Sequence, residues 1–540
     1  MTHEYLAGTA KKEVTSFIPG VGMMGYGQPH NKVAEVGTPL WARCLVLRDM
    51  NGKNIILIHL EQAFVTMALK EEIFHRIELN HPELALEESD LLVTAQHTHS
   101  APGGYSHYPF YNLTISGFQT KVFETIVGGA VLAVTAALKE MIPVSLKWGE
   151  IEISADKEVA FNRSIHAYLS NPESPKLSLQ DKSLAVNRKM EGLLLHDQRG
   201  KLKAHLNWFG VHCTSVSSFN QRIHHDNKGV AADLFEKNHP GSIAFFLQHT
   251  AGDISPNFIW DKKVGLMRGK FSDHYENAAF NGEIQFRESE RIEAHKSVSG
   301  KIESYLSYVD MAQAAAAPAH GLAFFRGTLE GPGIPAGFAA VLRITSRIRR
   351  FIDCMRSPEC REFYRKHGPK DVVIDHRNGN FVGVPLKFWK ALPVIPSHPL
   401  NVFQMTAKAR AIETLPWVPS IIPFQLLRIG NLLIACVPGE ITTIAGQRLH
   451  QLIEKESHGC GIEKIIITSY CNAYMGYITT AEEYQKQTYE GGHNVYGSET
   501  LDAVLLTYKK LVSRMKGDFC EAESVTPFHF PADELQRRSV

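Results

Sequence analysis

Residues 91–105 read Leu-Leu-Val-Thr-Ala-Gln-His-Thr-His-Ser-Ala-Pro-Gly-Gly-Tyr, and this stretch indicates both a fold class and a chemistry. Its first five residues are a short apolar run, which is typical of a buried strand. His97 and His99 follow two positions apart, so they point the same way if the strand continues. Two imidazoles at a strand end, beside a Gly-Gly loop, suit metal binding or acid–base work. A bare His-x-His pair is also common without a metal, so the stretch alone leaves this question open.

Predicted strands and helices alternate on both sides of this stretch. The alternation favours an α/β fold, organised as one large mixed catalytic domain. An Asn51-Gly52 turn joins two of the strands into a hairpin. The predicted strands cover residues 44–49, 55–60, 91–95, 206–211, 243–247, 424–429, 432–437 and 465–468, and the predicted helices cover 68–79, 118–139, 283–305, a stretch from about 440, and 500–515.

The composition is that of an ordinary globular protein, with a surplus of histidine. The chain has 540 residues, of which 44% are apolar and 21% charged, and this argues against a disordered, collagenous or coiled-coil protein. Its 57 Lys and Arg residues against 56 Asp and Glu residues leave a net charge of +1, so nucleic acid is not an expected partner. Most of the 26 histidines must be structural, because few side chains in any protein do chemistry.

The ends of the chain and its cysteines bear on its location. The N-terminus has no basic segment followed by an apolar core, and the longest apolar run, Val127–Leu138, is too short to span a bilayer. The eight cysteines form no Cys-x-x-Cys pair. We therefore expect a soluble protein with free, mostly buried thiols, either cytoplasmic or exported by a non-classical route.

Further motifs place candidate functional groups at the ends of predicted elements. His212 ends an apolar strand, and Ser255 lies among small residues in Gly-Asp-Ile-Ser-Pro-Asn at 252–257. Glu440 lies at a strand-to-helix junction, where the helix N-terminus favours an anion. A run over 472–492 is rich in tyrosine. Taken singly, these motifs have plainer explanations: a core histidine, a turn, a first-turn glutamate and packed tyrosines.

Taken together, the motifs resemble the neutral ceramidase family, the zinc-dependent amidases also called non-lysosomal ceramidases. The resemblance covers about residues 17–515. The matching stretches occur in the family's order and are residues 22–26, 97–105, 162–168, 207–215, 226–229, 252–257, 279–282, 437–449 and 472–492.

The resemblance implies a metal site. One Zn²⁺ per chain is expected, with His97, His212, Glu440 and Tyr477 as its ligands. Two imidazoles, a carboxylate and a phenol oxygen are an unusual set, but they suit Zn²⁺ with a position left open for water or substrate.

The resemblance also implies catalytic and substrate-binding roles. Ser255 lies where the family's proposed nucleophile lies, and His99 corresponds to the nearby acid–base or hydrogen-bonding group. Arg163 and Tyr489 correspond to groups that orient the substrate and stabilise the oxyanion, and Gly25 lies in a loop whose backbone approaches the ligand. Two mechanisms stay open: Ser255 attacks and forms an acyl-enzyme, or water activated by the metal attacks and Ser255 positions the amide.

The implied substrate is ceramide or a similar lipid amide, cleaved to a sphingoid base and a free fatty acid. Two alternatives are a related amidase that acts on another lipid N-acyl amide and an inactive lipid-binding relative. Members of the family usually carry a signal peptide and a C-terminal immunoglobulin-like domain, and neither is visible here. We therefore expect a short form of the family.

The predicted organisation is an N-terminal tail over 1–16, a catalytic domain over 17–515 and a C-terminal tail over 516–540. Within the domain, residues 338–400 are expected to be a divergent basic insertion or lid. Nine Lys and Arg residues and several apolar residues interleave at helical spacing over 338–370. This pattern is typical of a solvated surface helix, or of a lid that makes peripheral contact with a membrane.

Overall fold

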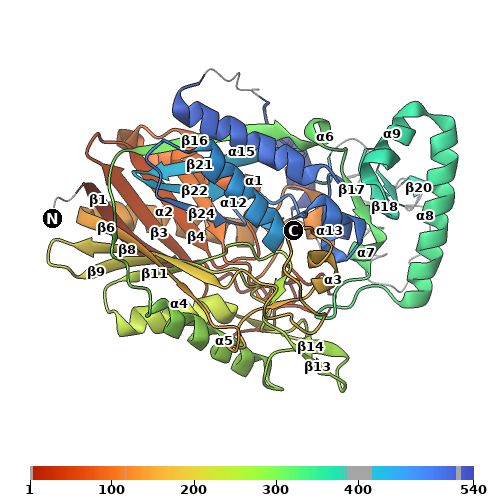
Figure 1. The fold of residues 1–540 in the computed structure, drawn as a ribbon, viewed down its shortest axis with the longest axis horizontal. Coiled ribbons are helices and arrows are strands. Elements are labelled where there is room, and N and C mark those ends of the chain that lie inside the picture. Colours follow the sequence, from red (N-terminus) through yellow and green to blue (C-terminus); the bar gives the residue numbers. More distant parts are fainter. Residues whose placement is uncertain are drawn as a thin grey trace.

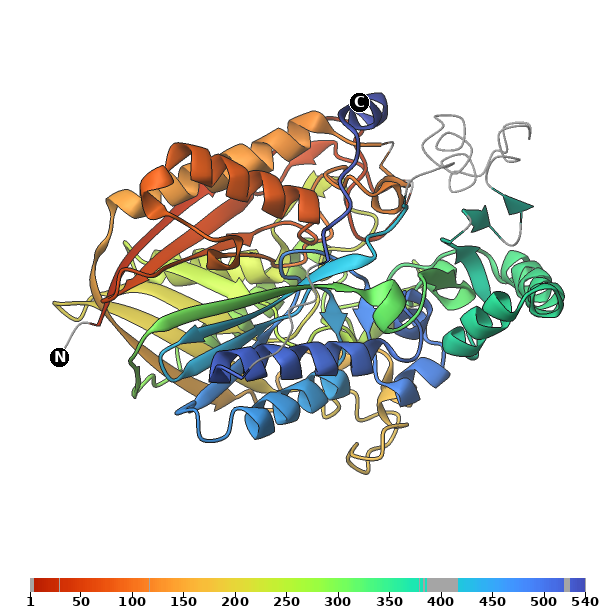
Figure 2. The same cartoon turned by 90° about the horizontal axis from the view of Figure 1, so that it is seen from above.

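The computed structural model describes residues 4–28, 30–115, 117–377, 379–381, 384–385, 416–518 and 525–539. Within these residues, two β-sheets lie face to face, and helices cover the outer face of each sheet (Figure 2). Helices packed on mixed sheets are the α/β class that the alternating sequence predicts.

The larger sheet has nine strands and is mostly antiparallel. The Asn51-Gly52 turn joins two of them, β3 and β4, with Leu47 opposite Ile55, so the predicted hairpin is confirmed. The order across the sheet is β11 (Ile243–Leu247), β9 (Leu202–Trp208), β8 (Lys189–Asp197), β6 (Ile142–Glu152), β1 (Tyr5–Glu13), β3 (Trp41–Asp49), β4 (Asn54–Leu60) and β5 (Leu91–Ala95), with β15 (Lys296–Val298) paired to β6.

Alternating apolar residues bury both faces of this sheet. In β3, Cys44 and Val46 belong to the core beneath the helices, whereas Leu45 and Leu47 belong to the core between the two sheets. This is the two-residue period of a strand that is covered on both faces. The strand sequence therefore determines that another layer must cover each side.

Two helices, α1 (Met67–Asn80) and α2 (Thr120–Lys139), cover the outer face of the larger sheet. α2 is long and apolar enough to cross a membrane, judged by length and composition only. However, it packs on β1 and β3, and Ala130, Val134 and Ala137 are fully buried there. Its apolar character is therefore explained by its place in the core.

The smaller sheet packs against the larger one and has four strands. In β22, Leu432 and Ile434 face the larger sheet, while Leu433 and Ala435 face outward, towards helices. The strand order is β16 (Ile302–Asp310), β21 (Ile421–Ile429), β22 (Leu432–Cys436) and β24 (Lys464–Thr468), and the covering helices are α12 (Thr443–Glu456) and α15 (Thr500–Lys516).

Parallel strand pairs bring several chain segments to one edge of the two sheets. β5 runs parallel to β4, β11 to β9, and β24 to β22. The segments that leave β5 and β24 also meet, because the Ala95 N–H donates a hydrogen bond to the Tyr470 carbonyl. The predicted site residues therefore follow strand ends that the topology gathers together.

Two helices form a separate lobe at one end of the molecule, α8 (Ala336–Arg356) and α9 (Pro358–His367), as Figure 1 shows. A small sheet of β17 (Ala319–Gly321), β18 (Val372–Asp375), β19 (Asn380–Phe381) and β20 (Val384–Pro385) accompanies them. The other elements are short or peripheral: β2 (Glu35–Val36), β7 (Phe161–Asn162), β10 (Arg222–Ile223), β12 (Ile254–Ser255), β13 (Ile259–Asp261), β14 (Leu266–Arg268), β23 (Glu440–Ile441), β25 (Tyr477–Ile478), α3 (Ile165–Tyr168), α4 (Asp226–Asn238), α5 (His274–Ser289), α6 (Met311–Ala314), α7 (Leu322–Phe325), α13 (Ala481–Gln485), α14 (Tyr489–His493), α16 (Ala532–Arg538), and 3-10 turns at Pro82–Leu84, Glu88–Asp90 and Pro109–Asn112.

Three predictions about the elements differ from the structure. The helix predicted over 283–305 is wrong, because α5 ends at Ser289 and strands β15 and β16 follow. The N-terminal tail is wrong for residues 5–13, which form β1 inside the larger sheet. The C-terminal tail includes α16, and Phe530 is buried beside Tyr108.

Two further predictions are partly tested. Residues 378, 382–383 and 386–400 of the predicted basic insertion lie outside the described residues. The prediction of free thiols is confirmed for the seven cysteines that the structure describes, of which Cys44, Cys213, Cys436 and Cys471 are buried.

Candidate functional site

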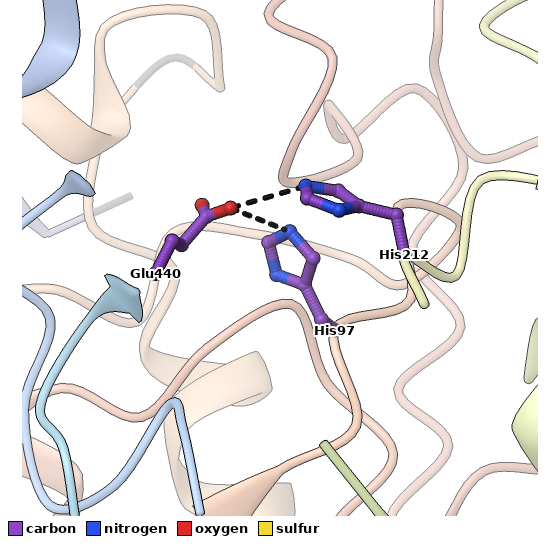
Figure 3. Close-up of side chains that lie close together, drawn as sticks. All are labelled: His97, His212 and Glu440. Atoms are coloured by element: carbon purple, nitrogen blue, oxygen red, sulfur yellow. Dashed lines mark ion pairs between the residues drawn. The ribbon is translucent and has the colours of Figure 1, made fainter. Parts of the chain in front are cut away.

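Three buried side chains meet at the edge where the strands end: His97, His212 and Glu440 (Figure 3). A carboxylate oxygen of Glu440 lies 3.1 Å from Nε2 of His212 and 3.6 Å from Nε2 of His97. One ligand atom from each residue falls within 4.8 Å of the other two. Among the described residues, these three side chains form a group that could hold a metal ion.

The backbone sets the tautomer of both histidines. Nδ1 of His97 lies 2.6 Å from the Ala63 carbonyl, and Nδ1 of His212 lies 2.8 Å from the Ile254 carbonyl. A carbonyl only accepts hydrogen bonds, so each Nδ1 carries a proton, and in the neutral ring that a metal requires each Nε2 would present its lone pair to the site. Two oriented nitrogen lone pairs and one carboxylate are a donor set that fits a divalent transition metal.

Two tyrosines hold the carboxylate of Glu440. The Tyr474 hydroxyl donates a hydrogen bond to one oxygen at 2.5 Å, and the Tyr470 hydroxyl donates to the other at 3.1 Å. The Tyr470 ring also stacks on His97, with 4.2 Å between the ring centroids. Although burial raises the pKa of Glu440, the neighbouring His97, His212 and Tyr474 hold it well below its usual range, so the group is a carboxylate.

The backbone at the candidate metal site has an uncommon conformation. His97 has a φ of 78° and Tyr470 a φ of 59°, in the left-handed region that side chains other than glycine rarely adopt. Such residues cost about 1–3 kcal/mol each and cluster at functional sites. Here the left-handed turn of His97 directly follows β5 and aims its ring at Glu440.

Tyr477 lies where a fourth ligand would lie. β25 pairs in parallel with β23, and this places Tyr477 beside Glu440 in register. The hydroxyl oxygen of Tyr477 is 3.3 Å from Nε2 of His212 and accepts a hydrogen bond from Arg163 at 2.8 Å. Its role as a ligand stays a prediction, although its oxygen faces the same space as the three other donors.

Arg163 is largely buried, with 13% of its side chain exposed, and is held by fixed partners. Its guanidinium donates to Glu490 at 2.9 Å and to the Gly252 carbonyl at 3.0 Å, in addition to Tyr477. Tyr489 lies close by, with its ring 5.7 Å from the guanidinium carbon of Arg163. Both predicted substrate-orienting groups therefore lie beside the candidate metal site.

His99 lies beside His97, with 3.0 Å between their Nε2 atoms. Burial, with smaller contributions from His97 and His212, lowers the pKa of His99 well below its usual range, so its ring is neutral. Gly25 packs against the other side of this ring: a Cβ atom at Gly25 would lie 2.4 Å from the His99 ring, and the φ of Gly25 is +124°. Only glycine fits this close approach.

Ser255 is brought near the site but is not joined to it. Its backbone neighbour Ile254 accepts the hydrogen bond from His212. Its own hydroxyl is fully buried, accepts a hydrogen bond from the Asn257 N–H at 2.9 Å, and also lies 3.5 Å from the Asn257 carbonyl. Among the described residues, no hydrogen bond connects it to a histidine or a carboxylate that could act as its base.

A cavity of about 470 Å³ opens onto the three metal-binding candidates. His97, His99, Arg163, His212, Glu440, Tyr477, Tyr489 and Gly25 line its inner end. Aromatic and aliphatic side chains line much of the remainder, including Phe64, Phe110, Phe324, Phe325, Phe338 and Leu342. A deep apolar cavity with polar groups at its base is suited to a ligand with a long hydrocarbon chain.

The motifs did not point to some residues that shape the site. Tyr470 and Tyr474 hold the carboxylate of Glu440, and Glu490 holds Arg163. His493 lines the cavity. Tyr474 and Glu490 lie inside the tyrosine-rich run, but their partners are far away in sequence. A hydrogen bond between distant segments leaves no local pattern that could identify them.

Comparisons with known proteins relate this chain to the neutral ceramidases. The family model described as "Neutral/alkaline non-lysosomal ceramidase, N-terminal" matches residues 5–389 and 399–506. A neutral ceramidase of Pseudomonas aeruginosa is 29% identical over 508 residues, which cover 92% of this chain and 70% of the relative. Neutral ceramidase B of Dictyostelium discoideum is 29% identical over a match that covers 94% of this chain and 72% of the relative.

Solved structures share the same layers. A structure described as a ceramidase complexed with C2 superposes with a TM-score of 0.79 at 27% identity, covering 98% of this chain and 78% of that one. The crystal structure of the neutral ceramidase from Pseudomonas aeruginosa gives a TM-score of 0.75 at 26% identity, with 98% and 77% coverage. Since the family model matches most of the chain and these structures share its fold, the chain belongs to the neutral/alkaline non-lysosomal ceramidase family.

Proposed function

We propose that this protein hydrolyses the N-acyl bond of ceramide, at a zinc ion held by His97, His212 and Glu440 with Tyr477 as fourth ligand. The observation that supports this most directly is the position of the metal-binding candidates. Two imidazole nitrogens and a carboxylate oxygen converge at the base of an apolar cavity, and membership of the ceramidase family supplies the reaction.

Zinc is the metal that these donors suit best. Two imidazole nitrogens and one carboxylate, in a buried site with an open position, are typical ligands of catalytic Zn²⁺. The absence of a thiolate among the donors argues against a structural zinc site. When bound, zinc would polarise the amide carbonyl or lower the pKa of a water molecule.

The residues around the metal candidates suggest a division of roles. Hydrolysis breaks the amide C–N bond, adds a hydroxyl to the acyl carbon and delivers a proton to the leaving amine. Arg163 and Tyr489 orient the amide and donate hydrogen bonds towards the developing negative oxygen. His99 is neutral, so the ring nitrogen that carries no hydrogen can accept a proton and pass it to the amine.

Two routes for the attack remain to be separated. Attack by Ser255 forms an acyl-enzyme and requires that the serine hydroxyl turn away from Asn257, its only partner among the residues described. Attack by water requires no such rearrangement, and the hydrogen bonds in the structure support this route. Trapping an acyl group on Ser255 in a slow-turnover variant would establish the first route instead.

The zinc site is tested by metal removal and by substitution. Ceramide hydrolysis should be lost on treatment with a chelator, return on addition of Zn²⁺, and be lost in His97→Ala. His239→Ala is the matched control, because His239 is a surface histidine paired with Glu290 away from the cavity. Activity that survives both the chelator and His97→Ala would refute the site.

The substrate class is tested with a panel of lipid amides. Ceramides of several acyl lengths and N-acyl amino acids would be compared by kcat/KM, because the apolar cavity accepts any long acyl chain. A preference for N-acyl amino acids would identify a related amidase. Zinc binding with no hydrolysis of any member would identify an inactive lipid-binding relative.

We also propose that α8 makes peripheral contact with an anionic membrane. Six apolar side chains recur at intervals of three and four residues, so they share one helix face. All are exposed, with relative exposures of 38% to 66%, and they are Phe338, Val341, Ile344, Ile348, Phe351 and Met355. An exposed apolar stripe of this length is uncommon on a soluble surface and marks an interaction site.

Charge and position favour a lipid surface as the occupant of this face. Nine basic and three acidic residues over 336–370 leave a net charge of +6. Although Arg343 and Arg347 both pair with Asp371, the surplus remains positive, as in helices that lie at a membrane interface. Phe338 of the same helix also lines the cavity, so the stripe continues towards the place where a lipid would enter.

Vesicle binding tests this contact. Ile348→Glu with Phe351→Glu should weaken binding to phosphatidylserine-containing vesicles at least about 100-fold, since burying each side chain contributes about 1.5–3 kcal/mol. Hydrolysis of a micellar short-chain ceramide should change little. Leu132→Glu, at an exposed position of α2, is the control. Unchanged vesicle binding in the double variant would exclude α8.

A further inference from the structure

One histidine in the cavity has no role in the proposed chemistry. His493 is the last residue of α14, is 5% exposed and lines the cavity. Neither of its ring nitrogens has a hydrogen-bond partner among the residues that the structure describes. A buried polar group without a partner costs about 1–3 kcal/mol, so such groups are expected to bind a ligand or an ordered water.

The described surroundings of His493 hold its ring in place but provide no hydrogen bond to its ring nitrogens. Phe324 lies 4.5 Å from it and Tyr477 lies 5.4 Å from it, measured between ring centroids. Behind it, a Cβ atom at Gly476 would lie 2.6 Å from the His493 carbonyl oxygen, so the backbone there is closely packed. Aromatic faces and tight backbone fix an imidazole but offer its nitrogens no conventional partner.

The location of His493 limits what it can bind. It contacts Tyr477 and lies 6.2 Å from the ring of Tyr489, so it is at the inner end of the cavity where the amide would lie. The hydrocarbon chains of a ceramide cannot satisfy an imidazole. The polar groups nearest to its amide are hydroxyls, and a neutral imidazole both donates to and accepts from a hydroxyl.

We infer that His493 is a specificity-determining residue, which binds a hydroxyl group close to the scissile amide of the substrate. This inference rests on the proposed ceramidase function and adds a preference to it. The hydroxyl is either on the sphingoid base or on the second carbon of the acyl chain. A site built to bind a hydroxyl rejects the analogue that lacks it, because its polar groups are then left buried and unpaired.

The experiment compares kcat/KM for four substrates: a ceramide, its 1-deoxy and 3-deoxy analogues, and its 2-hydroxyacyl derivative. Each pair that differs by one hydroxyl gives a ratio. In His493→Phe, which keeps a planar apolar ring, one of these ratios should fall at least 10-fold, and the pair affected identifies the hydroxyl. His493→Gln, which keeps a donor and an acceptor, should recover part of the ratio.

His205→Phe is the matched control. His205 is also buried with both ring nitrogens unpartnered in the described structure, but it packs on Phe235 and does not line the cavity. Its substitution should leave all ratios unchanged. If His493→Phe lowers kcat/KM for all four substrates by one common factor, or for none, the inference is overturned. Hydrolysis of none of the four by the wild-type protein would instead refute the proposed function, and this inference with it.

Discussion

Replacing Tyr474 with phenylalanine should weaken zinc binding without removing a ligand. The Tyr474 hydroxyl donates the shorter of the two hydrogen bonds to Glu440, at 2.5 Å, and the other comes from Tyr470 at 3.1 Å. A hydrogen bond to a charged group contributes about 1.5–3 kcal/mol. Since about 1.4 kcal/mol corresponds to a factor of ten, the zinc Kd of Tyr474→Phe should rise about 10- to 100-fold.

This range agrees with the usual effect of removing a partner that orients a metal ligand. The assay is competition for Zn²⁺ between the metal-free protein and a chromophoric chelator, together with ceramide hydrolysis at increasing free Zn²⁺. At saturating Zn²⁺, kcat should return close to the wild-type value, because all four proposed ligands are intact in this variant. The zinc midpoint of hydrolysis should shift by the same factor as the Kd.

Two further variants make the test specific. Tyr470→Phe should have the smaller effect, because its hydrogen bond is longer and a phenylalanine ring can still stack on His97. Tyr111→Phe is the control, since the Tyr111 hydroxyl donates to the Tyr474 carbonyl and not to Glu440. A zinc Kd for Tyr474→Phe within twofold of the wild-type value would refute the reasoning.

Three other perturbations have expected outcomes. Gly25→Ala should lower kcat/KM at least about 10-fold by displacing His99, whereas Gly20→Ala, with a positive φ but open space, should not; equal effects would contradict this. Ile466→Ala, between the two sheets, should lower the free energy of unfolding by about 2–5 kcal/mol in urea titrations, and a loss below about 1 kcal/mol would contradict the packing. Burial lowers the pKa of Lys370 to about 7, so between that value and its pKa of about 10.4 in the unfolded chain only the unfolded state holds the proton. The free energy of unfolding of the wild type should therefore rise with pH in this window by up to about 1.4 kcal/mol per pH unit. The wild-type value minus the Lys370→Met value should rise from pH 7 to pH 9, and a constant difference would refute this prediction.

The local patterns predicted most elements of the two sheets. The hairpin at Asn51-Gly52 and the helix that became α1 follow from turn chemistry and apolar periodicity, both of which act within a few residues. The helix predicted over 283–305 failed because a polar amphipathic pattern continued past the true end of α5 at Ser289. The second of the two strands that follow, β16, is stabilised by pairing with β21, which lies far away in sequence.

The site shows the same division. A histidine pair after a strand, a glutamate at a strand-to-helix junction and a tyrosine-rich run could be found by inspection, and their order identified the family resemblance. Their convergence could not be found in this way. Ser255 is the clearest case, because its motif alone could not show that the structure buries its hydroxyl against the Asn257 backbone.

The sequence by itself therefore determined most of the layer-forming strands, most of the covering helices and the chemical types of the candidate ligands. These properties depend on side-chain periodicity and on neighbours within one or two turns of the chain. Only the tertiary structure decided which of the 26 histidines meet a carboxylate. Parallel pairing in two stacked sheets brings the ends of β5, β9, β22 and β24 together, and backbone carbonyls from other segments then orient the rings of His97 and His212. Contacts of this kind join residues that are distant in sequence, so no local pattern encodes them.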